Sequence, residues 1–147
     1  MKKYISESPD ETRSVGFRLG GLLRPGDVVA LYGELGAGKT VLAQGIGTAF
    51  GINQREIVSA SFTVISEYDT TPPFIHIDLY RISNRAELTE LGLRECLGGN
   101  GISVIEWAEK AEGELPEDLI RIRLHTISEG VREITVEGVN GENRDNL

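Results

Sequence analysis

The sequence contains one cysteine, one tryptophan and no apolar run long enough to span a membrane. A single cysteine, Cys96, excludes an internal disulfide bond and suits a reducing compartment. Cys96 lies in an apolar helical stretch, so we interpret it as a packed thiol rather than a reactive one. The N-terminal residues lack the apolar core of a signal peptide. We therefore expect a cytoplasmic protein without a membrane partner.

Positive charge is scarce as well. The chain has 15 Lys and Arg against 23 Asp and Glu, which gives a formal net charge of −8 at pH 7, and most of the excess lies in residues 108–147. Binding to nucleic acid through a general electrostatic field needs clustered Lys and Arg. We therefore expect no direct strong binding to nucleic acid, and expect partners that are proteins.

The length and composition are typical of one globular domain with a sizeable core. The chain has 147 residues, of which 39% are hydrophobic and 26% charged. Residues 140–147 contain too few apolar side chains to fold. We predict one domain over residues 1–139, followed by a loose tail over residues 140–147.

One glycine-rich segment carries a specific motif. Gly33–Thr40 fits the phosphate-loop pattern of Gly, four residues, and Gly-Lys-Ser/Thr. Its glycines let the backbone wrap closely around an anion, so that successive N–H groups point at phosphate oxygens. Lys39 adds a charge for the β- and γ-phosphates, and the Thr40 hydroxyl is placed to ligate Mg²⁺. The following helix would present its positive N-terminal end to the same phosphates.

The residues on either side of this loop strengthen the prediction of a nucleotide site. Residues 27–32 form a short apolar run that is typical of a buried strand. Residues 40–50 place apolar side chains on one helical face, and Gly51 would end that helix. A strand, a glycine loop and a helix are the setting that a phosphate loop requires. The candidate nucleotide contacts in the loop are Glu34, Leu35, Gly36, Ala37, Gly38, Lys39 and Thr40.

The rest of the chain alternates between helical and strand patterns. Helices are predicted over residues 10–23, with Ser8 as the cap, and over 84–97, with Asn84 as the cap. Strands are predicted over residues 57–68, 74–81, 102–107, 119–127 and 131–139. The first two of these strands, and the last two, are predicted to form antiparallel hairpins. We therefore predict an α/β fold: a single P-loop NTPase domain with a mixed, mainly parallel sheet flanked by helices.

Two carboxylates are candidates for the chemistry of hydrolysis. Asp78 and Glu106 each end an apolar strand, which is the form of a Walker B element. If both strands run parallel to the strand at 27–32, both acids reach the sheet edge that carries the phosphates. The sequence leaves open which acid ligates Mg²⁺ and which orients the attacking water. Trp107, beside Glu106, is more typical of core packing than of ligand contact.

Further polar residues have less specific patterns. Ser59, Ser61 and Thr63 lie where a switch segment would sense a γ-phosphate, but the same pattern suits ordinary hydroxyls of a strand. His76 would share a strand face with Asp78. We interpret His76 as a structural histidine rather than a general base, because neither metal-ligand spacing nor a nucleophile partner is visible.

These elements, in this order, resemble the TsaE (YjeE) family, the bacterial ATPases of tRNA threonylcarbamoyladenosine biosynthesis. The resemblance is carried by Gly33–Thr40, by His-Ile-Asp-Leu-Tyr-Arg at 76–81 and by Ile-Glu-Trp at 105–107. Glu-Thr at 11–12 and Gly-Asp at 26–27 are supporting matches, and the similarity spans residues 8–136. A phosphate loop alone occurs in many families, but its combination with the other two elements is far more specific.

The resemblance implies a slow, partner-dependent ATPase that uses ATP and Mg²⁺. The implied partners are proteins of the TsaB and TsaD type, which attach threonylcarbamoyl to the adenosine next to the anticodon in tRNAs reading codons that begin with A. The implied role is to reset that complex between turnovers rather than to perform the transfer.

The resemblance also implies roles for matching residues. The implied catalytic residues are Lys39, Asp78 and Glu106, and the implied metal ligands are Thr40, Asp78 and Glu106. Further residues implied at or near the nucleotide are Thr12, Ser61 and Trp107. The segment Ser-Ala-Ser-Phe at 59–62 departs from the family's usual Ser-Pro-Thr-Phe, so Ser61 keeps a hydroxyl but loses the preceding proline.

Three other classes of protein share the phosphate loop. A GTPase is disfavoured because no Asn-Lys-x-Asp guanine element occurs in the sequence. A small-molecule kinase would need an acceptor pocket and a lid, for which the chain is short. A nucleotide-binding adaptor, whose output is the bound state rather than turnover, stays open as an alternative.

Overall fold

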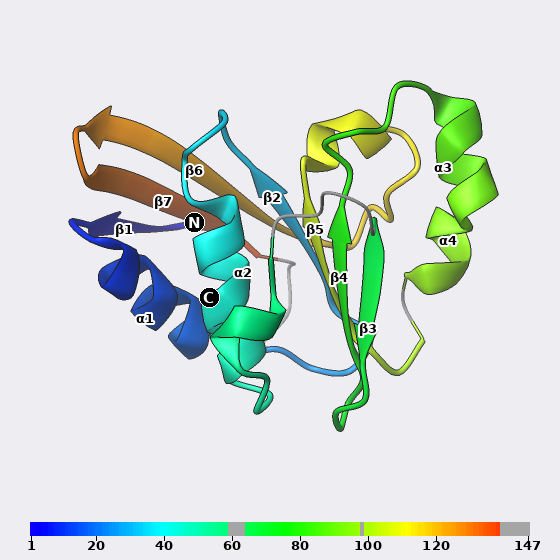
Figure 1. The fold of residues 1–147 in the computed structure, drawn as a ribbon, viewed down its shortest axis with the longest axis horizontal. Helices are drawn as coiled ribbons and strands as arrows, with labels where there is room; N and C mark the ends of the chain where they lie inside the picture. Colours follow the sequence, from blue (N-terminus) through cyan, green and yellow to red (C-terminus); the bar gives the residue numbers. More distant parts are fainter. Residues whose placement is uncertain (59–63, 98, 139–147) are drawn as a thin grey trace.

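A seven-stranded sheet is the centre of the structure, a computed structural model that describes residues 1–58, 64–97 and 99–138 (Figure 1). Its strands are β1 (Lys2–Ser6), β2 (Val28–Tyr32), β3 (Ile65–Tyr68), β4 (Phe74–Asp78), β5 (Ile102–Glu106), β6 (Ile120–Ser128) and β7 (Val131–Glu137). The helices are α1 (Pro9–Gly20), α2 (Lys39–Thr48), α3 (Arg85–Leu91) and α4 (Leu93–Cys96), with 3-10 turns η1 (Gln54–Glu56) and η2 (Ala108–Ala111).

The strand order is β1-β7-β6-β2-β5-β4-β3. The four inner strands, β6, β2, β5 and β4, are parallel, whereas β1, β7 and β3 run antiparallel to their neighbours. The predictions of an α/β fold, of a mixed sheet and of hairpins at β3–β4 and β6–β7 are confirmed. Because β2, β5 and β4 are parallel, their carboxyl ends meet at one edge of the sheet.

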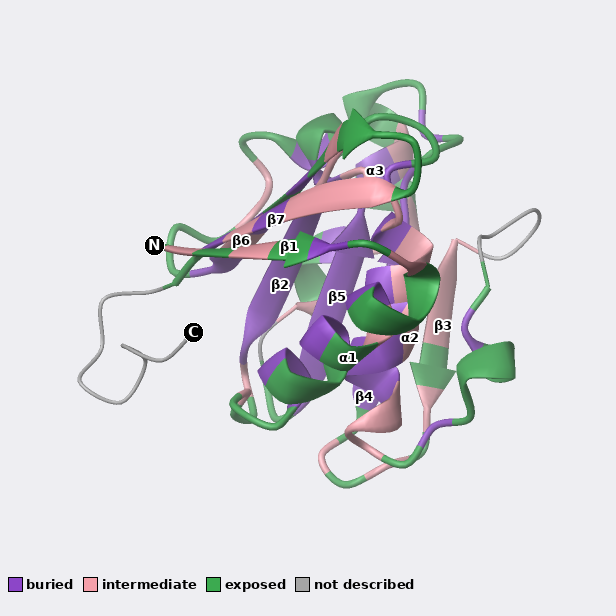
Figure 2. Ribbon diagram, turned by 90° about the vertical axis from the view of Figure 1, so that its left-hand side faces the viewer, coloured by how far each residue is buried: buried purple, intermediate pink, exposed green. Residues whose placement is uncertain are grey.

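Helices α1 and α2 cover one face of this sheet with their buried sides (Figure 2). Leu19 of α1 and Ile46 of α2 belong to the same core cluster as Leu31, Val104 and Ile122 of the strands. The two helices pack closely because Gly16 brings their backbones together: a Cβ at this position would lie 2.5 Å from the carbonyl oxygen of Leu42. Gly16 therefore serves the close packing of α1 against α2.

The opposite face has a second core cluster, under α3, α4 and η2. Leu88, Leu93 and Ala108 pack there with Ala30 of β2 and Ile105 of β5. Turn η2 thus contributes buried side chains, those of Ala108 and Ala111, to the core. No helix of the described residues is both long and apolar enough to cross a membrane.

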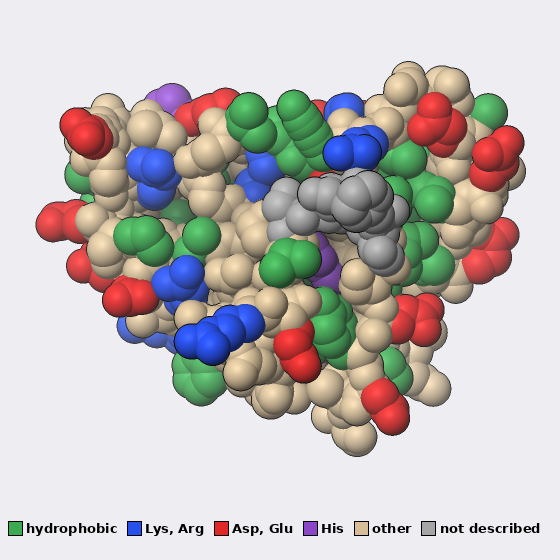
Figure 3. Space-filling view, viewed as in Figure 1, with side chains coloured by type: hydrophobic (Ala, Val, Ile, Leu, Met, Phe, Trp, Pro, Cys, Tyr) green, Lys and Arg blue, Asp and Glu red, His purple; other side chains and the backbone are tan. Residues whose placement is uncertain are grey.

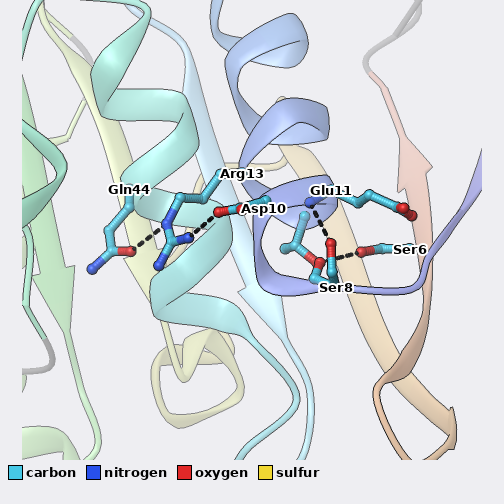
Figure 4. Close-up of polar contacts among 7 residues, drawn as sticks. Ser6, Ser8, Asp10, Glu11, Arg13 and Gln44 are labelled. Atoms are coloured by element: carbon cyan, nitrogen blue, oxygen red, sulfur yellow. Dashed lines mark hydrogen bonds and ion pairs between the residues drawn. The ribbon is translucent and has the colours of Figure 1, made fainter.

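The predicted helix caps are present. Ser8 accepts a hydrogen bond from the backbone N–H of Glu11 at 3.1 Å, and Asn84 accepts one from Glu87 at 3.0 Å. Figure 4 shows the Ser8 cap beside Arg13, whose side chain donates to Gln44 of α2 at 3.1 Å. Side-chain hydrogen bonds therefore fix the start of α1 and tie it to α2.

Apart from small shifts at the ends of several elements, three features differ from the predictions. Among the described residues of the predicted strand 57–68, only β3 is a strand. Ile57 is instead buried in the α1/α2 core, and its carbonyl accepts from Gln44 of α2 at 2.9 Å. The predicted helix 84–97 is divided into α3 and α4 by Gly92, which has a left-handed backbone (φ 71°). Strand β1, which the sequence did not predict, pairs with β7 along its whole length.

Candidate functional site

The predicted phosphate loop lies between β2 and α2. Two of its glycines, Gly36 and Gly38, have left-handed backbones, with φ of 82° and 101°. Residues with a Cβ rarely adopt these angles, which explains the glycines of the motif. Helix α2 begins at Lys39, directly after Gly38, and no side chain of the N-cap residue bonds to its first N–H groups.

The ammonium group of Lys39 is folded back onto this loop. Lys39 is only 5% exposed, and its Nζ donates to the carbonyl of Gly33 and, at 3.3 Å, to that of Glu34. Nζ also lies 3.4 Å from the centre of the Trp107 ring, in cation–π contact. The lysine is therefore held by the protein itself in this structure.

Burial lowers the pKa of Lys39 below its ordinary value, because the protein interior solvates a charge poorly. The negative charges of Glu109, Glu106 and Asp78 act in the opposite direction. An anion next to Nζ would add to these charges and favour the protonated lysine. The site therefore favours protonated Lys39 more strongly when an anion lies next to its ammonium group than when none does.

Trp107 has a strained backbone at the end of β5. Its φ of 58° and ψ of 43° are left-handed, and it is the one residue other than glycine with positive φ among those described. Its ring meets that of Tyr80 edge to face, at 5.0 Å between centroids. Such strain is typical of functional sites. The residue that sequence patterns assign to core packing therefore lies against Lys39 of the phosphate loop.

The two candidate carboxylates are neighbours on adjacent parallel strands. Asp78 of β4 is opposite Glu106 of β5, and each is 2% exposed. The hydroxyl of Thr40, in the first turn of α2, donates to Oε1 of Glu106 at 2.7 Å. Oδ1 of Asp78 accepts from the backbone N–H of Tyr80 at 3.0 Å. Parallel pairing thus brings both acids to the edge that carries the phosphate loop.

His76 lies beside the same carboxylate. It is 3% exposed, and its Nε2 is 2.5 Å from Oε2 of Glu106. The sequence predicts that His76 shares a strand face with Asp78, but it does not predict the contact with Glu106. The signal for this contact is the strand register: His76 pairs with Val104, two residues before Glu106 on the same face of β5.

Two hollows flank the phosphate loop. One, of about 280 Å³, is lined by loop residues, by Glu106 and by Trp107. The other, of about 180 Å³, lies between the loop and the start of α1, where Thr12 and Arg132 contribute to its wall. The Thr12 hydroxyl is 2.7 Å from that of Ser6. Thr12, far from the loop in sequence, therefore lies next to it.

The hairpin β6–β7 holds the loop from outside, which sequence reasoning missed. Arg132 donates to the carbonyls of Gly36, at 3.1 Å, and Ala37, at 3.2 Å. The backbone N–H of Thr126 donates to Glu34 Oε1 at 3.1 Å. A hydrogen bond from the backbone N–H of Glu34 itself, and then the one from Thr126, lower the pKa of the Glu34 carboxyl. No local pattern predicts these contacts, because they depend on how the hairpin crosses the loop.

The remaining site residues are less informative. Leu35 is 73% exposed at the tip of the loop. Ser61 lies outside the described residues.

Among the described residues, no group of three or more His, Cys, Asp and Glu side chains is arranged to hold a metal ion. Mg²⁺, however, is commonly held by one or two carboxylates together with phosphate oxygens and water. The hydroxyl of Thr40 and the carboxylate of Glu106 are donors of that kind.

Strand β2, the glycine loop and α2, at the carboxyl edge of parallel strands, define a P-loop domain of the α/β class. The family model described as "Threonylcarbamoyl adenosine biosynthesis protein TsaE" matches residues 6–134. This chain belongs to the TsaE family.

Relatives and a solved structure agree with this assignment. The chain is 40% identical over 134 residues to the tRNA threonylcarbamoyladenosine biosynthesis protein TsaE of Treponema pallidum, covering 91% of this chain and 98% of the relative. It is 37% identical over 138 residues to the protein of the same name from Bacillus subtilis, covering 93% and 85%. The crystal structure of Bacillus subtilis YdiB superimposes with a TM-score of 0.77 at 34% identity, covering 95% and 86% of the two chains.

Proposed function

We propose that this protein hydrolyses ATP with Mg²⁺ in the cytoplasm, as a component of tRNA threonylcarbamoyladenosine biosynthesis. Membership of the TsaE family supports the pathway. We assign the protein the role of resetting a complex of TsaB and TsaD type proteins between turnovers. Among the described residues on the face in Figure 3, basic and acidic side chains are interspersed without a continuous basic surface, which supports protein partners.

The hydrogen bond from Thr40 to Glu106 is the observation that carries the proposal. It joins the hydroxyl that a phosphate loop offers to Mg²⁺ with an acid at the end of a parallel strand. We therefore assign Glu106, with Thr40, to the metal. Asp78, the neighbour of Glu106 in register, is then the acid that orients water.

The phosphate loop, helix α2 and the strand ends would each have a separate role in hydrolysis. The N–H groups at the start of α2 and the Lys39 ammonium would bind phosphate oxygens. Asp78 would orient a water molecule for in-line attack on the γ-phosphorus while the bond to the β–γ bridging oxygen breaks. When bound, Mg²⁺ supplies positive charge that neutralises the phosphate oxygens. The hollow beside Thr12 and Arg132 would receive another part of the nucleotide.

The position of Lys39 supports slow, partner-dependent turnover. Its ammonium group is occupied by the carbonyls of Gly33 and Glu34 and by the Trp107 ring. These contacts must be exchanged for phosphate before the lysine can assist hydrolysis. A partner that moves Trp107 would favour that exchange.

The experiment is a measurement of phosphate release from ATP with Mg²⁺, with and without the purified TsaB and TsaD type proteins. We expect slow release by the protein alone, without any added acceptor, and faster release with the partners. Equal rates would contradict partner control, and a requirement for an acceptor would indicate a kinase. Unlabelled GTP should compete poorly with labelled ATP.

A cellular test separates turnover from binding alone. A Glu106→Gln variant that still binds ATP but does not hydrolyse it should fail to sustain the tRNA modification in cells depleted of the wild-type protein. Full modification would instead identify a nucleotide-binding adaptor. Loss of modification with normal protein abundance supports hydrolysis as the output.

A further inference from the structure

His76 is a buried histidine for which the hydrolysis described above has no use. It is 3% exposed in the middle of β4, and its Nε2 contacts Oε2 of Glu106, a carboxylate that is 2% exposed. Buried polar groups cost free energy unless they are hydrogen-bonded. The contact therefore satisfies both side chains at once.

The carboxylate of Glu106 is held at both oxygens. Thr40 donates to Oε1 at 2.7 Å, and His76 occupies Oε2 at 2.5 Å. A carboxylate that ligates a metal ion can only accept, so in that state the imidazole donates through Nε2–H. Two donors from different elements, one on α2 and one on β4, fix the plane of the carboxylate. With only one donor, the side chain of Glu106 would be free to turn about its last torsion.

We infer that His76 is the positioning residue for the metal-binding carboxylate, holding Glu106 so that Oε1 faces the Thr40 hydroxyl. This inference rests on the proposed function, because it takes Thr40 and Glu106 as the groups beside Mg²⁺. Groups that orient a metal-binding side chain typically contribute about 10- to 100-fold to metal affinity. His76 should thus set the affinity for the metal rather than the affinity for the nucleotide.

A purely structural histidine would behave differently. Its replacement would lower the stability of the sheet, but metal binding by the folded fraction would be unchanged. Metal affinity measured separately from nucleotide affinity therefore distinguishes the two roles. Mn²⁺ is a suitable probe, since it accepts the same oxygen ligands as Mg²⁺ and is detected by electron paramagnetic resonance.

Three substitutions of His76 test the donor itself. His76→Leu keeps volume without a donor. His76→Gln places an amide N–H near the position of Nε2, whereas the shorter His76→Asn places it near Nδ1, out of reach of Glu106. His125→Leu is the matched control, because His125 is the other histidine of the chain and is exposed on β6.

Mn²⁺ binding is titrated in the presence of saturating ADP, and ADP binding is measured without metal. We expect about 10- to 100-fold weaker Mn²⁺ binding for His76→Leu and His76→Asn, with metal-free ADP affinity unchanged. His76→Gln should recover most of the affinity, and His125→Leu should match the wild type. If His76→Leu does not fold, the comparison of Mn²⁺ affinity between His76→Gln and His76→Asn is sufficient to test the inference.

Equal Mn²⁺ affinity of the Gln and Asn variants, or of the Leu variant and the wild type, would overturn the inference and leave the proposed function intact. Absence of Mn²⁺ binding by the wild-type protein with ADP would overturn both. Loss of metal-free ADP binding in the His76 variants would also overturn the inference, since it would show a general disturbance of the loop.

Discussion

The phosphate loop is held from two sides by two different kinds of structure. On the inner side, the parallel strands β4 and β5 end in the buried acids Asp78 and Glu106, and the side chain of Glu106 contacts those of Thr40 and His76. On the outer side, the antiparallel hairpin β6–β7 touches the loop at its backbone or at exposed groups. The inner side carries the candidate chemistry, and the outer side supports the shape of the loop.

Burial explains why the two sides should differ in energetic weight. Asp78 and Glu106 are 2% exposed, so their interactions are little screened by water. Glu34, at the outer side, is exposed, and interactions there are weakened by solvent. Substitutions on the inner side should therefore affect function strongly, and those on the outer side only modestly.

Asp78→Asn should give the largest effect, on turnover. The amide keeps an oxygen for the N–H of Tyr80 but is a poor base, so Mg²⁺–ATP binding is retained while hydrolysis falls by about 10²- to 10⁴-fold. Single-turnover phosphate release, with the partner proteins present, measures the effect. Asp118→Asn, an exposed acid outside the site, is the control. A rate within a few-fold of the wild type would remove Asp78 from the chemistry.

Lys39→Ala should give the next largest effect, on ATP affinity. Each hydrogen bond from the charged ammonium to phosphate contributes about 1.5–3 kcal/mol, so affinity should fall by about 10- to 150-fold. Isothermal titration calorimetry with ATP and Mg²⁺ gives the dissociation constant. Lys110→Ala is a matched control, since Lys110 also donates to two backbone carbonyls, those of Tyr80 and Ile82. Equal losses in both variants would contradict a specific role of Lys39.

The difference between the two sides also determines what the sequence can predict. Asp78 and Glu106 could be placed together from the sequence, because apolar strands that end in acids bring them to one edge once the strands are parallel. The hairpin β3–β4, which adjoins these strands, follows from local patterns in the same way. Local chemistry and pairing rules therefore predict the inner side well.

The outer side depends on long-range geometry instead. Arg132 belongs to a strand whose pattern gives only alternation, and nothing local indicates that its guanidinium reaches Gly36. Strand β1 was missed for a similar reason, because Lys2–Ser6 is an edge strand defined by pairing with β7. Ile57 was assigned to a strand by its β-branched neighbourhood, but the amide of Gln44 binds its carbonyl. In all three places, tertiary contacts determine the structure, and local sequence patterns do not show them.

Arg132→Ala should have a smaller effect, and it tests the support from the hairpin. The loop loses donors to Gly36 and Ala37, and we expect ATP affinity to fall by about fivefold, or roughly 1 kcal/mol, because the contacts are partly exposed. Isothermal titration calorimetry with ATP and Mg²⁺ measures this change in ATP affinity. Arg123→Ala is the control, since Arg123 lies on the same hairpin but stacks over Tyr32. A loss as large as that of Lys39→Ala would place the hairpin among the principal determinants of binding.

Glu34→Gln should have the smallest effect, and the effect should depend on pH. Hydrogen bonds from the backbone N–H groups of Glu34 and Thr126 lower the pKa of the Glu34 carboxyl below its ordinary value of 4.5. The folded state thus favours the carboxylate, and this stabilisation is fully present above pH 4.5 and is lost as the pH falls through the folded-state pKa. Because Glu34 is exposed, the difference in Tm between the wild type and the variant should be at most about 2 °C near pH 7. This difference in Tm should shrink as the pH falls into the acid range. The control Glu129→Gln, at an exposed turn, should show no such trend. A difference in Tm that is constant with pH would contradict this role of the Glu34 carboxylate.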